Sequence, residues 1–168
     1  MTMPTHPATL YFMCGKMAAG KSTHAKALAE AKNAVLIVQD DLLAGLYPGE
    51  ILVIPDFVKY SARLRDALTP HIVALLSHGV SVVLDFPGNT RTQREWFRTL
   101  FEGAGVAHEL HYIDAPDDPC KQQLKQRSAG LPAGAPWTTY AELDAITEYF
   151  QSPAEDEGFT VVHHTRSV

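Results

Sequence analysis

The stretch FMCGKMAAGKST, residues 12–23, decides the fold that we expect for this chain of 168 residues. It satisfies the complete pattern G-x-x-x-x-G-K-[ST] with Gly15, Gly20, Lys21 and Ser22. An apolar run precedes the pattern and an alanine-rich segment follows it, which predicts a strand, a tight loop and a helix. In such a loop the glycines let backbone N–H groups turn inward toward phosphate oxygens, next to the positive end of the helix. The stretch therefore predicts a phosphate-binding loop.

The loop residues have separate expected roles. Lys21 supplies a positive charge for the β and γ phosphates of ATP, and the Ser22 hydroxyl is expected to bind Mg2+. Lys16 adds a further positive charge within the motif. Its side chain is expected either to contact the phosphates or to lie on the protein surface. The expected nucleotide-binding residues are Gly15, Lys16, Met17, Ala18, Ala19, Gly20, Lys21, Ser22 and Thr23.

Strand and helix patterns alternate along the rest of the chain. The expected strands cover residues 9–14, 34–39, 80–85, 107–114 and 159–164. The expected helices cover residues 21–32, 57–76, 91–104, 117–127 and 139–150. Pro70 must either kink the second of these helices or start a new one after a Thr69 cap. The alternation predicts a single α/β domain, residues 1–168, with a five-stranded, mostly parallel sheet and helices on both faces.

Carboxylates follow several of the expected strands. In a parallel sheet the carboxyl ends of all strands meet at one edge, so these groups are expected to share a cleft with the phosphate loop. Asp85 is expected to hold Mg2+ opposite Ser22, with a turn cap as the alternative. Asp40 is expected to accept a proton from an attacking hydroxyl, with helix capping as the alternative, while Asp41 is expected to cap a helix that begins at Leu42.

Phosphoryl transfer also needs cations near the transferred oxygens. Arg127, just before the Gly- and Pro-rich loop at 128–136, is the first candidate, in a lid at about 125–140. Arg91 and Arg94, beyond Asp85, come next. The alternative for each arginine is a solvated helix face.

Composition excludes several classes of protein. The net charge is −5, from 14 Lys and Arg against 19 Asp and Glu, and no basic stretch suggests a nucleic-acid partner. No apolar run is long enough for a membrane span, and the start has no secretory pattern, so we expect a cytoplasmic protein.

Cys14 is expected to be a small buried residue rather than a nucleophile. His163 and His164 end the last strand, but no second ligand pair stands at metal spacing, which argues against zinc.

With the phosphate loop, VQDDLL at 38–43 and VVLDFPGNTRTQR at 82–94 in place, the chain resembles the small P-loop kinase-like ATP-binding proteins. This group includes AAA-type single-domain ATPases related to zeta toxin, chloramphenicol phosphotransferase and polynucleotide-kinase-like enzymes. The resemblance implies a P-loop NTPase three-layer sandwich with a lid. It also implies that Asp40 is the base toward the acceptor and Asp85 the Walker B aspartate, and that Arg127 is a lid arginine. Many relatives carry a basic residue where this chain has Leu43.

The resemblance places the acceptor pocket in the region of residues 42–79. Tyr47, Phe57, Tyr60 and Arg63 could line such a pocket, although Phe57 and Tyr60 fit the hydrophobic core better.

The sequence therefore predicts an ATP- and Mg2+-dependent phosphotransferase that moves the γ-phosphate to a hydroxyl of a small molecule. One alternative is a nucleotide switch, because DFPG at 85–88 fits D-x-x-G, although no N-K-x-D tetrapeptide for guanine occurs. The other is an ATPase that acts through a protein partner.

Overall fold

The computed structural model describes residues 7–15, 20–114 and 150–165. Five parallel strands form one sheet in the order β2-β3-β1-β4-β5. The strands are β1 (Thr9–Cys14), β2 (Val35–Val38), β3 (Val82–Asp85), β4 (Ala107–Asp114) and β5 (Val161–Thr165). Every described strand pair is parallel, which confirms the expected sheet.

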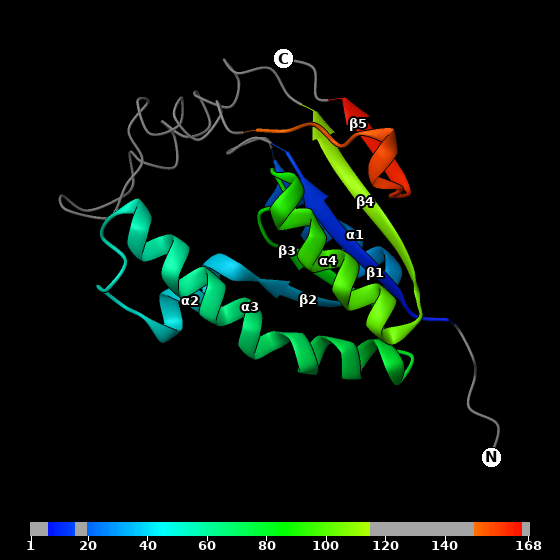
Figure 1. The fold of residues 1–168 in the computed structure, drawn as a ribbon. Coiled ribbons are helices and arrows are strands. Elements are labelled where there is room, and N and C mark those ends of the chain that lie inside the picture. Colours follow the sequence, from blue (N-terminus) through cyan, green and yellow to red (C-terminus); the bar gives the residue numbers. More distant parts are fainter. Residues whose placement is uncertain (1–6, 16–19, 115–149, 166–168) are drawn as a thin grey trace.

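Helices cover both faces of this sheet (Figure 1). They are α1 (Lys21–Lys32), α2 (Gln39–Leu46), α3 (Ile54–Ser77) and α4 (Arg91–Ala104), and a short 3-10 turn, η1, covers Glu155–Glu157. Helix α1 packs on β1, β2 and β3 from one side, whereas α3 and α4 pack together on the other. The three-layer α/β sandwich is thus confirmed.

The central strand β1 is buried on both faces. Phe12 is fully buried in the core beneath α3 and α4, together with Leu10 and Cys14. Tyr11 and Met13 point to the other side and pack against Ala25 of α1 and its neighbours. Because successive side chains of a strand alternate between faces, a strand covered on both sides needs a continuous apolar run. This explains why residues 9–14 show no polar alternation.

Several element boundaries differ from the expected ones. Strand β2 ends at Val38, and α2 begins at Gln39 rather than at Leu42. Asp41 is therefore not the cap of this helix: it lies with Asp40 in the first turn, where carboxylates favour the positive helix end. Strands β3 and β5 each begin two residues later than expected, because their pairing with the neighbouring strands starts at Val82 and at Val161.

Helix α3 runs through Pro70 without interruption. It changes direction partway along its length (Figure 1), as a proline inside a helix requires. Thr69 does not cap a new helix, since its hydroxyl donates to the Arg65 carbonyl at 2.7 Å and accepts from Trp96 Nε1 at 2.9 Å. Of the two alternatives left open by the sequence, the structure shows the kink.

The capping box expected at the start of α4 is present. Thr90 Oγ1 accepts from the Gln93 N–H at 3.1 Å, and Gln93 Oε1 accepts from the Thr90 N–H at 3.3 Å. Among the described residues, no helix is both long and apolar enough to cross a membrane. The expected helix at 117–127, the lid at 125–140 with Arg127, and nearly all of the helix at 139–150 lie outside the described residues.

Phe97 tests the packing of α4 on the sheet. Its ring stacks on Phe12 with centroids 4.6 Å apart, and it is fully buried. Phe97→Ala should lower the free energy of unfolding by about 3–5 kcal/mol, because truncation leaves a cavity under the central strand. Val58→Ala, at an exposed position of α3, should change it by less than about 0.5 kcal/mol. Urea denaturation followed by circular dichroism measures both, and equal effects would contradict this assignment of the core.

Candidate functional site

The carboxyl ends of three neighbouring strands place the expected site residues along one edge of the sheet. Gly15 follows β1, Asp85 ends the adjacent β3, and Asp40 follows β2 in the first turn of α2. Val38 stands beside Asp85 in the strand register, so α2 starts next to this aspartate. Asp85 is half-buried and Asp40 is exposed. The structure therefore brings two carboxylates and Gly15, the start of the expected phosphate loop, to the same edge.

The start of the loop fits closely against the sheet. A Cβ atom on Gly15 would lie 2.7 Å from the carbonyl oxygen of Ile113, so this position accepts only glycine. The Gly15 N–H donates to Asn89 Oδ1 at 3.1 Å, and Lys21 Nζ donates to the Gly15 carbonyl at 2.6 Å. The lysine head thus lies back over the entrance of the loop. Four loop residues, Lys16, Met17, Ala18 and Ala19, lie outside the described residues.

The end of the loop leads directly into α1. Gly20 has φ 100° and stands before the first residue, Lys21, where no side chain caps the helix. A left-handed φ of this kind favours glycine. Ser22 and Thr23 are exposed in the first turn. Uncapped N–H groups in a first turn attract anions, so this end of α1 has the character of a phosphate-binding helix terminus.

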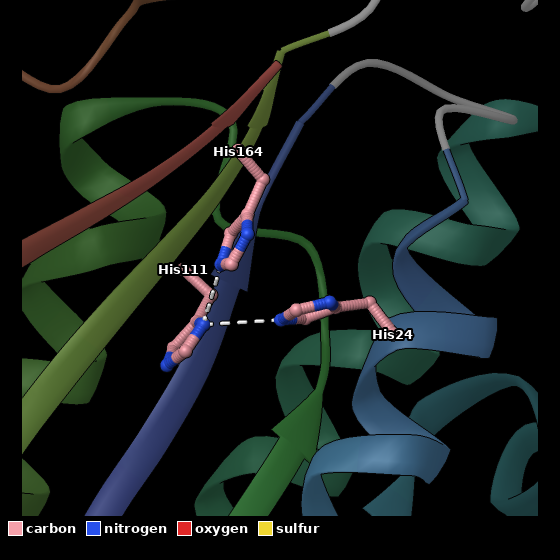
Figure 2. A group of neighbouring side chains, drawn as sticks. All are labelled: His24, His111 and His164. Atoms are coloured by element: carbon pink, nitrogen blue, oxygen red, sulfur yellow. Dashed lines mark hydrogen bonds between the residues drawn. The ribbon is translucent and has the colours of Figure 1, made fainter. Parts of the chain in front are cut away.

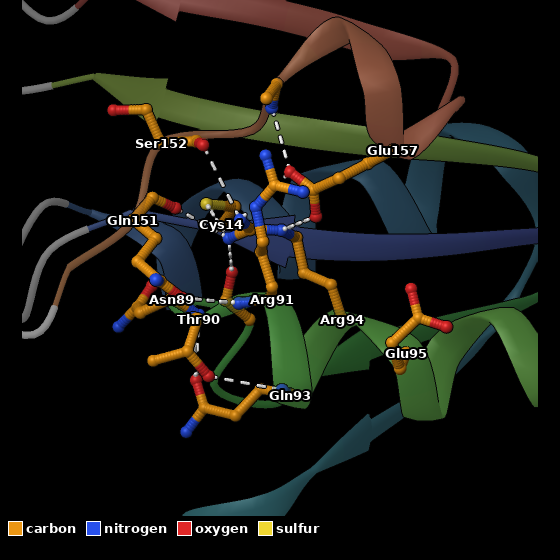
Figure 3. Close-up of polar contacts among 12 residues, drawn as sticks. Cys14, Asn89, Thr90, Arg91, Gln93, Arg94, Glu95, Gln151, Ser152 and Glu157 are labelled. Atoms are coloured by element: carbon orange, nitrogen blue, oxygen red, sulfur yellow. Dashed lines mark hydrogen bonds and ion pairs between the residues drawn. The ribbon is translucent and has the colours of Figure 1, made fainter.

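A polar network that the sequence did not predict holds Gly15, the residue at which the loop begins (Figure 3). Asn89 Oδ1 accepts from the Gly15 N–H, and the Asn89 N–H donates to Gln93 Oε1 at 2.8 Å. The Asn89 carbonyl accepts from the Gln151 N–H at 2.8 Å, and Gln151 Oε1 accepts from the Arg91 N–H at 2.9 Å. The segment after β3, the start of α4 and the segment before β5 are therefore joined beneath Gly15.

Arg94 is the centre of this network and is fully buried. Its Nε donates to Glu157 Oε1 at 2.8 Å and its Nη2 donates to Glu157 Oε2 at 3.1 Å. Its Nη1 donates to the carbonyls of Gly88 at 2.9 Å and Gln151 at 2.8 Å. Burial opposes ionisation of Glu157, but hydrogen bonds from Arg94 and the Ala154 N–H outweigh it and lower the pKa of the Glu157 carboxyl.

Neither arginine after Asp85 is arranged as a phosphate ligand. The guanidinium of Arg94 is buried between α4 and η1, where it pairs with Glu157. Arg91 pairs with the exposed Asp156 through bonds of 2.9 and 2.8 Å. The expectation that these two side chains serve phosphoryl transfer is not supported by their contacts. The remaining candidate, Arg127, lies outside the described residues.

Cys14 behaves as the sequence suggests. Burial raises the pKa of its thiol to about 11, against the opposing effect of Arg94, whose Nη1 lies 3.8 Å from the sulfur. A thiol with this pKa is protonated at neutral pH and is a poor nucleophile.

Gly88 explains the D-x-x-G sequence in terms of packing. A Cβ atom on Gly88 would overlap the Met13 carbonyl and lie 2.9 Å from the ring of Phe97. The glycine is therefore needed where this segment crosses β1, and its carbonyl is held by Arg94. The pattern at 85–88 thus has a structural reason that does not involve a nucleotide switch.

The region expected to hold the acceptor, residues 42–79, comprises most of α2, the following loop and α3. Helix α2 directly follows β2, and α3 packs against α2. The rings of Tyr47 and Tyr60 stack with centroids 4.2 Å apart, and the Arg63 guanidinium lies 5.6 Å from the centre of the Tyr60 ring. Phe57 and Tyr60 also pack against the main core, as expected.

Gln39, at the first position of α2, is a further residue that the sequence did not single out. Its side chain is 1% exposed, yet its amide oxygen and nitrogen have no hydrogen-bond partner among the described residues. Buried amides normally have partners. The edge beside Asp85 therefore has unused hydrogen-bonding capacity.

Comparison with protein families identifies the chain. Residues 10–153 match the model of the AAA domain family. The chain belongs to this family. No curated protein matches the sequence significantly.

Comparison with solved structures shows which proteins share the fold of this AAA domain. A sugar kinase from Janibacter sp. matches with a TM-score of 0.65 and 19% identity, over 95% of this chain and 86% of that chain. The APS kinase of Mycobacterium tuberculosis, in complex with AMPPNP and APS, matches with a TM-score of 0.59 and 20% identity, over 96% and 91% of the two chains. Kti12 of Chaetomium thermophilum, in complex with ADP-AlF3, matches with a TM-score of 0.65 and 14% identity, over 92% of this chain and 88% of that chain. The AAA domain described here has the fold of the P-loop kinases.

Arg94 tests the network beneath the loop. Arg94→Met should lower the free energy of unfolding by about 3–5 kcal/mol, because it leaves the buried Glu157 carboxylate without its cation. Arg91→Met is the matched control: it removes an exposed pair from the same helix and should have little effect. Urea denaturation of both variants at neutral pH is the measurement. An Arg94→Met protein as stable as the control would show that the pair adds nothing to the fold.

Proposed function

We propose that this AAA domain is an ATP-dependent phosphotransferase that moves the γ-phosphate of ATP to a hydroxyl group of a small molecule. The observation that carries the proposal is the complete glycine-rich motif of the sequence, whose Gly15 lies at the sheet edge and accepts from Lys21, with Asp85 at the end of β3 and Asp40 just after β2. The likeness to kinases, among them an APS kinase solved with AMPPNP and APS, supports it.

The described residues fit ATP and Mg2+. The start of α1, which no side chain caps, suits a phosphate chain, because its N–H groups and the positive end of the helix attract anions. The Ser22 hydroxyl and the Asp85 carboxylate are hard oxygen ligands of the kind that Mg2+ prefers. When bound, Mg2+ neutralises charge on the phosphate oxygens. The nucleotide cradle would be Gly15 to Thr23, including Lys16, Met17, Ala18, Ala19 and Gly20.

The chemistry then divides among few side chains. Lys21 would hold the β and γ phosphates, and its present bond to the Gly15 carbonyl shows that its head reaches the loop entrance. Asp40, exposed at the start of α2, would take the proton of the acceptor hydroxyl. At the same step the hydroxyl oxygen would bond to the γ-phosphorus, and ADP would leave. Arg127 would complete the site as a lid arginine. The acceptor would lie against α2 and the start of α3.

Nucleotide binding is the first test of this proposal. Isothermal titration with ATP in Mg2+ should show binding to the wild type that Lys21→Ala weakens about ten- to hundredfold, the value of a hydrogen-bonded charge. Lys26→Ala, an exposed change on the same helix, is the matched control and should bind as the wild type does. Preference for GTP would favour a switch instead, and binding of neither nucleotide would disprove the proposal.

The role of Asp40 is tested by turnover. With an acceptor found by screening hydroxyl compounds for acceptor-dependent ADP release, Asp40→Asn should reduce kcat about a hundredfold or more while ATP still binds. Asp41→Asn, the neighbouring carboxylate of the same helical turn, should retain near-normal kcat. ATP hydrolysis that no acceptor stimulates would point to an ATPase acting through a protein partner.

A further inference from the structure

Three histidine side chains from distant parts of the sequence meet on the α1 side of the sheet (Figure 2). His24 Nε2 lies 3.0 Å from His111 Nδ1, and His164 Nε2 lies 3.0 Å from the same atom. One nitrogen from each ring falls in a group whose atoms all lie within 4.8 Å of one another. His111 is buried, and the other two rings are half-buried. The rings come from α1, β4 and β5.

The strand register accounts for this meeting. Ile113 stands beside His164 in the pairing of β4 with β5, and His111 lies two residues before Ile113. Positions two apart share a face of the sheet, so both histidines point toward α1. His24, in the first turn of α1, completes the group. His163 points to the opposite face, where it contacts Asp114 at 3.0 Å.

Hydrogen bonding among the rings does not satisfy them. His111 Nε2 lies 3.1 Å from Glu109 Oε1, a carboxylate that accepts the Nε2 proton. His111 Nδ1 then has a single lone pair, yet two imidazole nitrogens lie 3.0 Å from it. One lone pair accepts one well-aligned N–H, and a protonated Nδ1 would likewise donate to only one neighbour. A cation accepts a lone pair from each of the three nitrogens at once.

The arrangement has the chemistry of a zinc centre. Zn–N bonds of about 2.0–2.1 Å at tetrahedral angles separate the ligand nitrogens by about 3.3 Å. The two separations of 3.0 Å are close to this value, and the nitrogens of His24 and His164 lie within 4.8 Å of each other, a separation that rotation of these half-buried rings would shorten. A carboxylate on the far nitrogen of a ligating histidine, as Glu109 is here, fixes the ring and raises its basicity.

We propose that His24, His111 and His164 form a binding site for Zn2+, with Glu109 orienting His111. Three protein ligands leave the fourth tetrahedral position for water or another small ligand. The site lies one helical turn along α1 from Lys21, so the metal fastens the start of this helix to β4 and β5. The proposal goes beyond the phosphotransferase function and does not depend on it.

The sequence argument against zinc treated His163 and His164 as a pair. Neighbouring residues of a strand face opposite sides, so only His164 is a ligand. His111 lies 53 residues before His164 in the chain, and His24 lies a further 87 residues before His111. No spacing pattern within one segment could show this cluster.

Metal binding to the tag-free full chain tests the site. After removal of metals with EDTA and dialysis, titration with Zn2+ should show one equivalent bound with a dissociation constant of micromolar or below. Co2+ as a probe should give the intense visible absorption of a four-coordinate ion. Zn2+ should also raise the melting temperature, because it binds the folded chain preferentially. Binding no tighter than about millimolar would overturn the proposal.

Substitutions locate the bound metal. His24→Gln and His164→Gln should each weaken Zn2+ binding about a hundredfold or more and abolish the rise in melting temperature, and Glu109→Ala should weaken binding about tenfold or more. The matched control is His163→Gln, one residue from a ligand but on the other face, which should bind as the wild type does. Melting in EDTA checks that each variant folds. Unchanged Zn2+ affinity in both ligand variants would place the metal elsewhere and overturn the proposal.

Discussion

The buried ion pair of Arg94 with Glu157 holds together the segments on which the phosphate loop rests. A guanidinium without solvent contact is stable only when its donors are paired, and here they meet one carboxylate and the carbonyls of Gly88 and Gln151. Because these groups belong to the turn after β3 and the segment before β5, the pair fixes Asn89 where it accepts from Gly15. Gly15, at the start of the loop, is therefore held by this buried ion pair through Asn89 as well as by its place at the end of β1.

The sequence predicted the architecture well because the relevant signals are local. The motif at residues 12–23, the apolar strands and the Thr90–Gln93 capping box each depend on neighbours along the chain, and the structure confirms the elements that they predicted. Boundaries were less accurate: α2 begins at Gln39, since strand pairing with β3 stops at Val38. The proposed roles of Lys21, Asp40 and Asp85 remain predictions that the placement of these residues supports.

What the sequence missed depends on contacts between distant segments. Arg94 shares the stripe of α4 that carries Phe97 and Phe101, and a cation on a core-facing stripe is a signal for a buried partner. The identity of that partner, Glu157, could not be read from the sequence, because 63 residues separate the two. The histidine cluster was hidden for the same reason. Its members share a face only once the register of β4 and β5 is known.

The network under the loop also has a consequence for how the chain folds during synthesis. The motif at residues 12–23 leaves the ribosome before Gln151 and Glu157, which secure Asn89 and Arg94 and lie far along the chain from it. Contacts of such long sequence separation form late, because they must first overcome the entropy of closing a large loop. The nascent chain therefore carries this motif before the residues that support Gly15 have been made. The buried pair that helps to hold Asn89 against Gly15 is therefore completed only after η1 has been made.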